Sequence, residues 1–196
     1  MNKIVAITGG IGSGKSTAIK IIEKLGYKSF SADLTYKKLL ENERFVKEIS
    51  SLLGVEPVTL NGKLSIDKNA ISRLVFADEE KLKILNAFTH PKIMEEMITS
   101  ARLCSGIAFC EVPLLFEGGY EDLFDYIFII KRNDEIRFES ASIRDGKTVD
   151  QIKNIAKNQF DYAKITQNAH TFIIENDLSE EALAEKIKVA IKDIQK

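Results

Sequence analysis

The chain has few of the residues that mark secreted, metal-bound or membrane proteins. Among its 196 residues there is no tryptophan, and the only cysteines are Cys104 and Cys110. Their separation fits neither a zinc-binding spacing nor a disulfide framework, so we predict two reduced thiols with a structural role. No stretch approaches the roughly 18 apolar residues of a membrane span. The N-terminus also lacks the pattern of a signal peptide, so we expect a cytoplasmic protein.

An excess of charge of either sign is also missing. The 28 Lys and Arg residues almost balance the 29 Asp and Glu residues. Such a balance gives no field that would attract nucleic acid or an anionic membrane, so we expect neither as a partner and favour a small-molecule substrate. With 44% hydrophobic residues, the chain can bury the core of one globular unit.

Short apolar runs rich in β-branched residues alternate with segments of helical periodicity. This alternation predicts an α/β fold, in which a parallel five-stranded sheet is flanked by helices. The final segment, Ser179 to Gln195, has apolar residues on one face and acids in its first turn, which predicts an amphipathic helix. The expected strands are Lys3 to Ile7, Lys28 to Ala32, Ile107 to Val112, Tyr126 to Ile130 and Thr171 to Ile174.

The connection between the second and third expected strands is unusually long. At about seventy residues it exceeds a simple crossover, so we interpret it as a helical insertion that carries a substrate site. Helical stretches are expected near Leu34 to Leu53, Lys68 to Phe76 and Asp78 to Leu103, with breaks around Pro57 and Gly62.

The stretch "GGIGSGKS" lies between the first expected strand and a segment of helical periodicity. Gly9, Gly14, Lys15 and Ser16 fit the pattern G-x-x-x-x-G-K-[ST]. Glycines allow backbone N–H groups to turn around an anion, the lysine reaches the β- and γ-phosphates, and the serine hydroxyl binds Mg²⁺. The motif predicts binding of a nucleoside triphosphate and does not identify a reaction.

Other features favour a kinase of small molecules. The chain lacks the Asn/Thr-Lys-x-Asp motif of GTPases, and it has both the long insertion and a basic segment after the fourth expected strand. The alternatives are a kinase of another acceptor, such as a nucleotide, shikimate or gluconate, and a nucleotide-dependent regulatory module.

Two carboxylates lie at the ends of expected strands and should face the phosphate loop. Ligands of open α/β sheets bind beyond the carboxyl ends of the strands, which is where Asp33 and Glu111 fall. Asp33 either orients and deprotonates an acceptor hydroxyl or caps the helix that begins near Leu34. Glu111 either orders water around magnesium or simply ends its strand.

The basic segment "KRNDEIRFESASIRDGKT" offers three arginines that could stabilise a transferring phosphoryl group. We favour Arg144 for this role and expect Arg132 and Arg137 on a solvated face. His90, which precedes Pro91, either meets a phosphate or ends a helix before the proline.

Together these residues resemble the dephospho-CoA kinase family, which phosphorylates the ribose 3′-hydroxyl of dephospho-CoA in the last step of coenzyme A synthesis. The resemblance covers nearly the whole chain. The stretches that carry it are "ITGGIGSGKS", "SAD", "RLVFADEEKLKILNAFTHPKI", "EVPLLFEGGYEDLFDYIFII", "RDGKT" and "FIIEN". The phosphate loop is shared by many families, whereas "VPLLFE" together with "VF" and "THP" is far more specific.

The resemblance implies a substrate, cofactors and a set of site residues. ATP and Mg²⁺ are expected, with dephospho-CoA as the acceptor. Asp33 would be the catalytic base, Lys15 and Arg144 would stabilise the phosphoryl group, and Ser16 would hold Mg²⁺. The expected nucleotide-binding residues are Gly10, Ile11, Gly12, Ser13, Gly14, Lys15, Ser16, Thr17 and Asn176.

The implied domains are a nucleotide-binding core of residues 1–33 and 106–196, including a lid at about 136–165, and an acceptor-binding insertion of residues 34–105. The chain departs from the family where arginines are common. Lys68 replaces one in the insertion, Ser140 replaces one four residues before Arg144, and Ile155 and Ala156 stand where another is usual before Gln159. Lysine supplies the charge of arginine but not its bidentate fork.

Overall fold

A computed structural model describes residues 2–60 and 62–196, and the chain forms two compact units. One unit consists of Met1–Ser31 and Ser100–Lys196, and the other of Ala32–Thr99. No helix in the described part of the chain combines the length and apolar character that a bilayer crossing requires.

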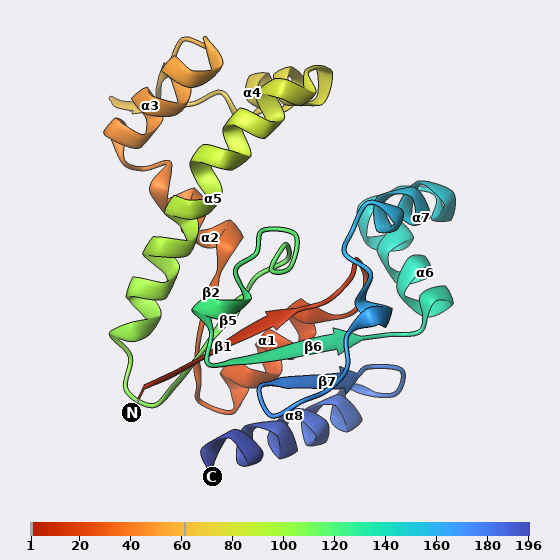
Figure 1. Cartoon of the computed structure of the whole chain (residues 1–196). Coiled ribbons are helices and arrows are strands. Elements are labelled where there is room, and N and C mark those ends of the chain that lie inside the picture. The colour runs from red at the N-terminus through yellow and green to blue at the C-terminus, as the bar shows by residue number, and fades with distance from the viewer. Residues whose placement is uncertain (1, 61) are drawn as a thin grey trace. The chain divides into compact units, whose positions relative to one another are not determined.

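The first unit is built on a parallel sheet, which confirms the predicted fold class. Its order is β2-β5-β1-β6-β7, so the strand that leads to the phosphate loop is central (Figure 1). The two strands beside β1 in the sheet pair with it in parallel, with Ile7 opposite Glu111 of β5 and Phe128 of β6. The five strands are β1 (Lys3–Thr8), β2 (Lys28–Ser31), β5 (Ile107–Glu111), β6 (Tyr126–Lys131) and β7 (Thr171–Glu175).

Two helices cover one apolar face of this sheet. Helix α1 (Lys15–Lys24) and helix α8 (Glu180–Gln195) share one core cluster with β1, β5, β6 and β7. In Figure 1, α8 lies beneath β7. The central strands are apolar without alternation because they are covered on both faces. Ser179 accepts a hydrogen bond from Ala182 N, so α8 begins as the sequence predicts.

The second unit has a small core of its own, formed around Phe45, Val46, Ile49 and Leu53. The single helix expected over Leu34 to Leu53 is wrong, because the chain forms α2 (Ala32–Leu39) and α3 (Glu43–Leu53). The Asn42 side chain caps α3 by accepting from Arg44 N and Phe45 N, and this competes with a continuous helix.

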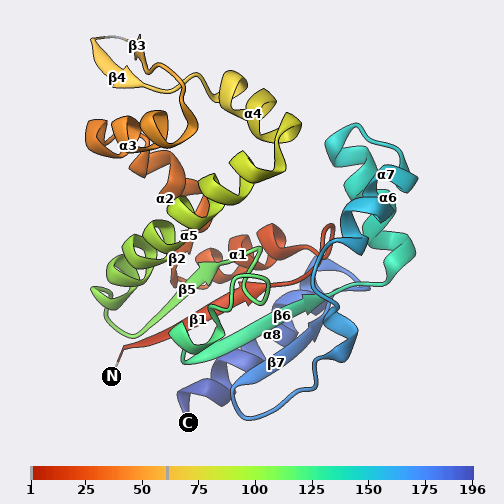
Figure 2. The same ribbon diagram turned by 45° about the horizontal axis from the view of Figure 1, so that its top comes forward.

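The break around Pro57 and Gly62 contains a hairpin that the sequence analysis missed. Strands β3 (Val58–Leu60) and β4 (Lys63–Ser65) pair antiparallel, and Figure 2 shows them beside α3 and α4. Gly62 has φ 75°, which glycine adopts at little cost. Helix α4 (Lys68–Ala77) matches its prediction closely and begins after Asp67, which caps it.

Helix α5 (Glu79–Arg102) continues through Pro91, so the interpretation of His90 as a helix end is wrong. A proline inside a helix costs about 3 kcal/mol or more. The turns that follow are anchored by burial, since Met94 is 4% exposed and Met97 is fully buried. Burying each such side chain stabilises by about 1.5–3 kcal/mol, enough to offset the proline.

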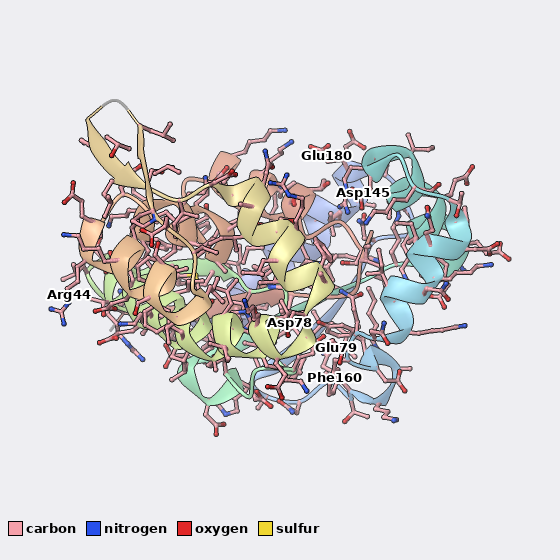
Figure 3. All side chains as sticks on the ribbon, turned by 90° about the horizontal axis from the view of Figure 1, so that it is seen from above. Arg44, Asp78, Glu79, Asp145, Phe160 and Glu180 are labelled. Atoms are coloured by element: carbon pink, nitrogen blue, oxygen red, sulfur yellow. The ribbon has the colours of Figure 1, made fainter. Side chains whose placement is uncertain are left out.

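Helices α6 (Asp134–Asp145) and α7 (Val149–Lys157) form the segment from which a lid is expected. They pack on each other through Phe138, Ala141 and Ile152, and Ile11 of the phosphate loop joins this cluster. Figure 3 labels Asp145, where α6 ends, and Phe160, which follows α7, at well-separated points of this segment. Lid motion remains a prediction.

The two faces of α8 give a test of the packing. Ile187 is fully buried in the core, whereas Val189 on the same helix is 60% exposed. Ile187→Ala should lower the free energy of unfolding by about 2–5 kcal/mol, and Val189→Ala should change it by less than about 0.5 kcal/mol. Urea denaturation followed by circular dichroism measures both. Equal losses for the two variants would contradict this packing.

Candidate active site

The phosphate loop connects the central strand to α1. β1 ends at Thr8 and α1 begins at Lys15, after Gly14 in a left-handed conformation with φ 98°. Gly12 also has a positive φ, and a Cβ there would lie 2.1 Å from the Arg137 carbonyl oxygen. A side chain at position 12 would therefore collide with backbone. The first turn of α1 contains no acidic residue, which leaves its positive dipole end available to an anion.

Lys15 lies folded over the loop that precedes it. Its Nζ donates to the carbonyl oxygens of Gly9 at 2.7 Å and Gly10 at 3.1 Å. Burial lowers the pKa of Lys15 from 10.5 to about 8, although the charge of Glu111 opposes this shift. A desolvated ammonium group interacts strongly with any phosphate that enters, because few water molecules screen it.

Ser16 and Glu111 bring two oxygen groups together beside the loop. The Ser16 Oγ donates to Glu111 Oε1 at 3.3 Å. The strand register explains this contact, since Glu111 ends β5 opposite Ile7 of β1. A hydroxyl and a carboxylate are the oxygen ligands that Mg²⁺ prefers. Within residues 2–60 and 62–196, no three His, Cys, Asp or Glu side chains gather so that they could hold a metal ion by themselves.

Asn176 supports the loop from the end of β7. Its Nδ2 donates to the Ser13 carbonyl oxygen at 2.9 Å, and its backbone N donates to the Lys131 carbonyl oxygen at 2.8 Å. The residue is only 8% exposed. A Cβ at Gly14 would lie 2.2 Å from Nδ2, so the glycine makes room for this amide. In the structure Asn176 thus contacts the loop that is expected to hold the nucleotide.

Two residues of the expected lid hold the Ile11 peptide. Gln159 Oε1 accepts from Ile11 N at 2.8 Å, and Arg137 Nη1 donates to Ile11 O at 3.1 Å. The expectation that Arg137 lies on a solvated face is wrong, because its side chain is 17% exposed and also pairs with Asp134. Spacing along a helix could not reveal this contact, which depends on how α6 meets the loop.

The three arginines of the basic segment have different surroundings. The Arg144 guanidinium donates to both carboxylate oxygens of Asp145, at 2.6 and 2.8 Å, and the side chain is 61% exposed. Its positive charge contributes to lowering the pKa of Lys15. The expectation of a solvated Arg132 is also wrong, because its Nε is buried. Arg132, Arg137, Gly10 and Ser13 line one cavity of about 490 Å³.

Asp33 and His90 belong to the other unit. Asp33 is an exposed residue in the first turn of α2, which begins at Ala32, so its interpretation as a cap before that helix is wrong. It follows the last residue of β2 by two positions. His90 is half-buried within α5, and burial lowers its pKa.

An aromatic cluster beside the loop was also missed by sequence reasoning. The Tyr162 hydroxyl lies 3.1 Å from Thr8 Oγ1, and the Tyr162 ring packs edge-on against Phe116 and Phe160. The signal available in the sequence was the pair of aromatic residues in "FDY", directly after Gln159. These contacts connect the end of the expected lid to Thr8, the last residue of β1 before the phosphate loop.

The cysteines are free thiols, as predicted. Cys110 is fully buried in β5, and this burial raises its pKa to about 12. Cys104 is half-buried after α5. A thiol with such a raised pKa is a small apolar side chain at neutral pH and not a nucleophile.

The parallel sheet and the phosphate loop, with Lys15 and Ser16 at the start of α1, define the P-loop class of nucleotide-binding kinase folds. Shikimate kinase from Acinetobacter baumannii shares this fold, with a TM-score of 0.55 at 11% identity over 100% of this chain and 94% of that one. The dephospho-CoA kinase family model matches residues 3–181. The chain therefore belongs to the dephospho-CoA kinase family.

Individual relatives agree with this membership. The chain is 34% identical to the dephospho-CoA kinase of Chlorobaculum tepidum, over 89% of this chain and 86% of that protein. It is 32% identical to that of Fusobacterium nucleatum, over 94% and 95%. Dephospho-CoA kinase from Campylobacter jejuni superposes with a TM-score of 0.70 at 30% identity, over 99% of this chain and 98% of that one. A crystal structure from Thermus thermophilus gives 0.78 at 29%, with 98% of each chain covered.

The lowered pKa of Lys15 predicts how nucleotide affinity depends on pH. An anion beside Lys15 favours its charged form, so nucleotide binding should raise the pKa and take up a proton near pH 8. Affinity for Mg-ADP should therefore fall as pH rises through about 8, by up to about tenfold per pH unit. Calorimetry between pH 7 and 9, in buffers with different heats of ionisation, measures both effects.

Lys15→Met should abolish the proton uptake, whereas Lys20→Met, on the exposed face of α1, should leave it unchanged. Constant affinity from pH 7 to 9 with no proton uptake would contradict the assignment of this pKa to the binding site.

Proposed function

We propose that the protein transfers the γ-phosphoryl group of ATP to the ribose 3′-hydroxyl of dephospho-CoA, giving coenzyme A. One observation carries this proposal. A chain of the dephospho-CoA kinase family has Lys15 hydrogen-bonded over a glycine-rich loop at the start of α1, an arrangement that binds polyphosphates. The reaction is an in-line displacement in which the 3′-oxygen forms a bond to phosphorus and ADP leaves.

Catalysis in such a reaction comes mainly from positioning and charge neutralisation. The loop amides from Gly12 to Ser16, together with the Lys15 ammonium, would hold the β- and γ-phosphates. Asn176, Gln159 and Arg137 support this role, because their side chains fix the loop through Ser13 and Ile11. A loop held on both sides needs little reorganisation when the nucleotide binds.

The residues present fit a magnesium ion beside the phosphates. Ser16 and Glu111 would hold it, directly or through water, because their oxygens already lie 3.3 Å apart. Bound there with the nucleotide, Mg²⁺ would neutralise charge on the β- and γ-phosphates.

The acceptor is assigned to the helical insertion. In this proposal, Asp33 orients the 3′-hydroxyl and accepts its proton, since it lies two residues after the end of β2 and is exposed. Arg144 would leave Asp145 to contact the transferring group as the lid closes. Closure would also keep water from the phosphoryl group and suppress hydrolysis of ATP.

The deciding experiment measures ADP formation from Mg-ATP by the purified protein, with and without dephospho-CoA. AMP, adenosine, shikimate and gluconate are offered as other acceptors. The proposal predicts a rate that depends on dephospho-CoA and yields coenzyme A. Turnover with another acceptor would reassign the insertion, and slow hydrolysis independent of any acceptor would indicate a regulatory module.

The roles of Asp33 and Lys15 give a second test. Asp33→Asn removes the proposed base, so kcat should fall about 10²- to 10⁴-fold while the affinity for Mg-ADP stays unchanged. Lys15→Ala should also remove most of kcat, but with weaker nucleotide binding. Asp193→Asn, which changes an exposed carboxylate near the C-terminus, is the control and should have normal kcat. A near-normal rate for Asp33→Asn would refute its assignment as the base.

A further inference from the structure

The guanidinium of Arg132 makes fewer hydrogen bonds in the structure than it could. This residue directly follows β6, and its Nη1 donates to Ser140 Oγ of α6 at 3.2 Å. Its Nε–H is buried and has no hydrogen-bond partner among the described residues. A buried donor without a partner is unfavourable, which favours a rotamer change once a ligand is available. The adjoining cavity, which Gly10 and Ser13 also line, gives the side chain room to turn.

The neighbouring arginines have defined partners. Arg137 donates to Ile11 O and pairs with Asp134, and its guanidinium lies 4.2 Å from the centre of the Phe138 ring. Arg144 donates twice to Asp145. Arg132 differs from both because, within the described residues, its side chain donates only to a neutral hydroxyl, a bond that is easily exchanged.

The order of the strands indicates which part of the nucleotide Arg132 meets. The phosphate loop follows β1, with β5 and β2 on one side and β6 and β7 on the other. The proposed acceptor residue Asp33 follows β2, and Glu111 ends β5. The transferred γ-phosphoryl group must point toward the acceptor for in-line attack. The nucleoside end must therefore extend toward β6 and β7, where Arg132 lies.

From this arrangement we propose that Arg132 binds the adenosine half of ATP, with the planar face of its guanidinium stacked on the purine base. The inference rests on the proposed function, in which the γ-phosphoryl group faces the acceptor side of the sheet. Arginine suits the contact because its guanidinium is planar, weakly hydrated and stacks on aromatic faces. Ser140 holds the side chain beside the cavity until the nucleotide arrives.

The hydrogen bond between Arg132 and Ser140 also explains how the chain can function with a serine at position 140. The resemblance to the dephospho-CoA kinase family leads us to expect an arginine at position 140, four residues before Arg144, where the chain has a serine. In this chain a guanidinium reaches Ser140 from the end of β6 instead. The end of β6 thus supplies, through Arg132, the cation that α6 lacks at Ser140. An arginine at either of these two positions should therefore serve the same role.

The test compares two ligands that share phosphates and differ in the nucleoside. Calorimetry without acceptor gives the affinities for Mg-ADP and for Mg-pyrophosphate. Arg132→Ala should weaken Mg-ADP binding roughly tenfold and change pyrophosphate binding less than about twofold. Arg132→Lys keeps the charge but not the planar face, so it should lose most of the same affinity. Arg102→Ala, which changes a half-exposed arginine near the start of the sheet, is the control and should bind both ligands normally.

Kinetics and a rescue variant separate this role from a structural one. Arg132→Ala should raise the KM for ATP about tenfold with kcat within about twofold. The double variant Arg132→Ala with Ser140→Arg should recover most of the affinity for Mg-ADP.

Equal losses for ADP and pyrophosphate would overturn the inference in favour of a phosphate contact, and unchanged ADP binding would exclude any role in binding the nucleotide. Both readouts are independent of the acceptor. If Arg132 selectively affects ADP binding but no coenzyme A is formed, the proposed function fails and the inference stands. If coenzyme A is formed but Arg132→Ala binds ADP normally, the inference fails and the proposed function stands.

Discussion

The site depends on keeping a strongly curved backbone open to an anion. Hydrogen bonds from the Asn176 and Arg137 side chains to the Ser13 and Ile11 carbonyl oxygens hold the curve from two sides. The same contacts occupy carbonyl groups that would otherwise repel phosphate. Lys15 provides the charge, and its burial makes that charge costly until an anion arrives. Positioning and electrostatics therefore come from one local arrangement, in which each group stabilises the loop and prepares it for its ligand.

The central position of β1 explains why residues from distant parts of the chain meet at this loop. Its neighbours β5 and β6 end beside it, so Glu111 and the segment that begins with Arg132 flank the phosphate loop. Gln159 and Tyr162 return from the far end of α7 to contact Ile11 and Thr8. The loop is therefore hydrogen-bonded to residues from both ends of the helical segment that is expected to form the lid.

Sequence reasoning succeeded where a local pattern determines the structure. The five strands, the phosphate loop and α8 were predicted because continuous apolar runs, glycine spacing and a helical apolar face are short-range signals. It failed where the structure is determined by contacts between residues far apart in the sequence. The hairpin at Val58–Ser65 and the continuation of α5 through Pro91 depend on packing, and the half-buried positions of Arg132 and Arg137 depend on where α6 meets the loop. Exposure of a charged side chain is not encoded in its neighbours along the chain.

The separate core of residues 32–99 has a consequence for how such proteins diversify. This unit buries its own apolar cluster around Phe45 and Ile49, and the chain enters and leaves it once. In the proposed function this unit binds the acceptor, so mutations inside it would alter which alcohol is selected while leaving the folding of the other unit largely undisturbed. The residues that select the acceptor and those that transfer the phosphoryl group would then lie in separate units. Each set could change during evolution at its own rate.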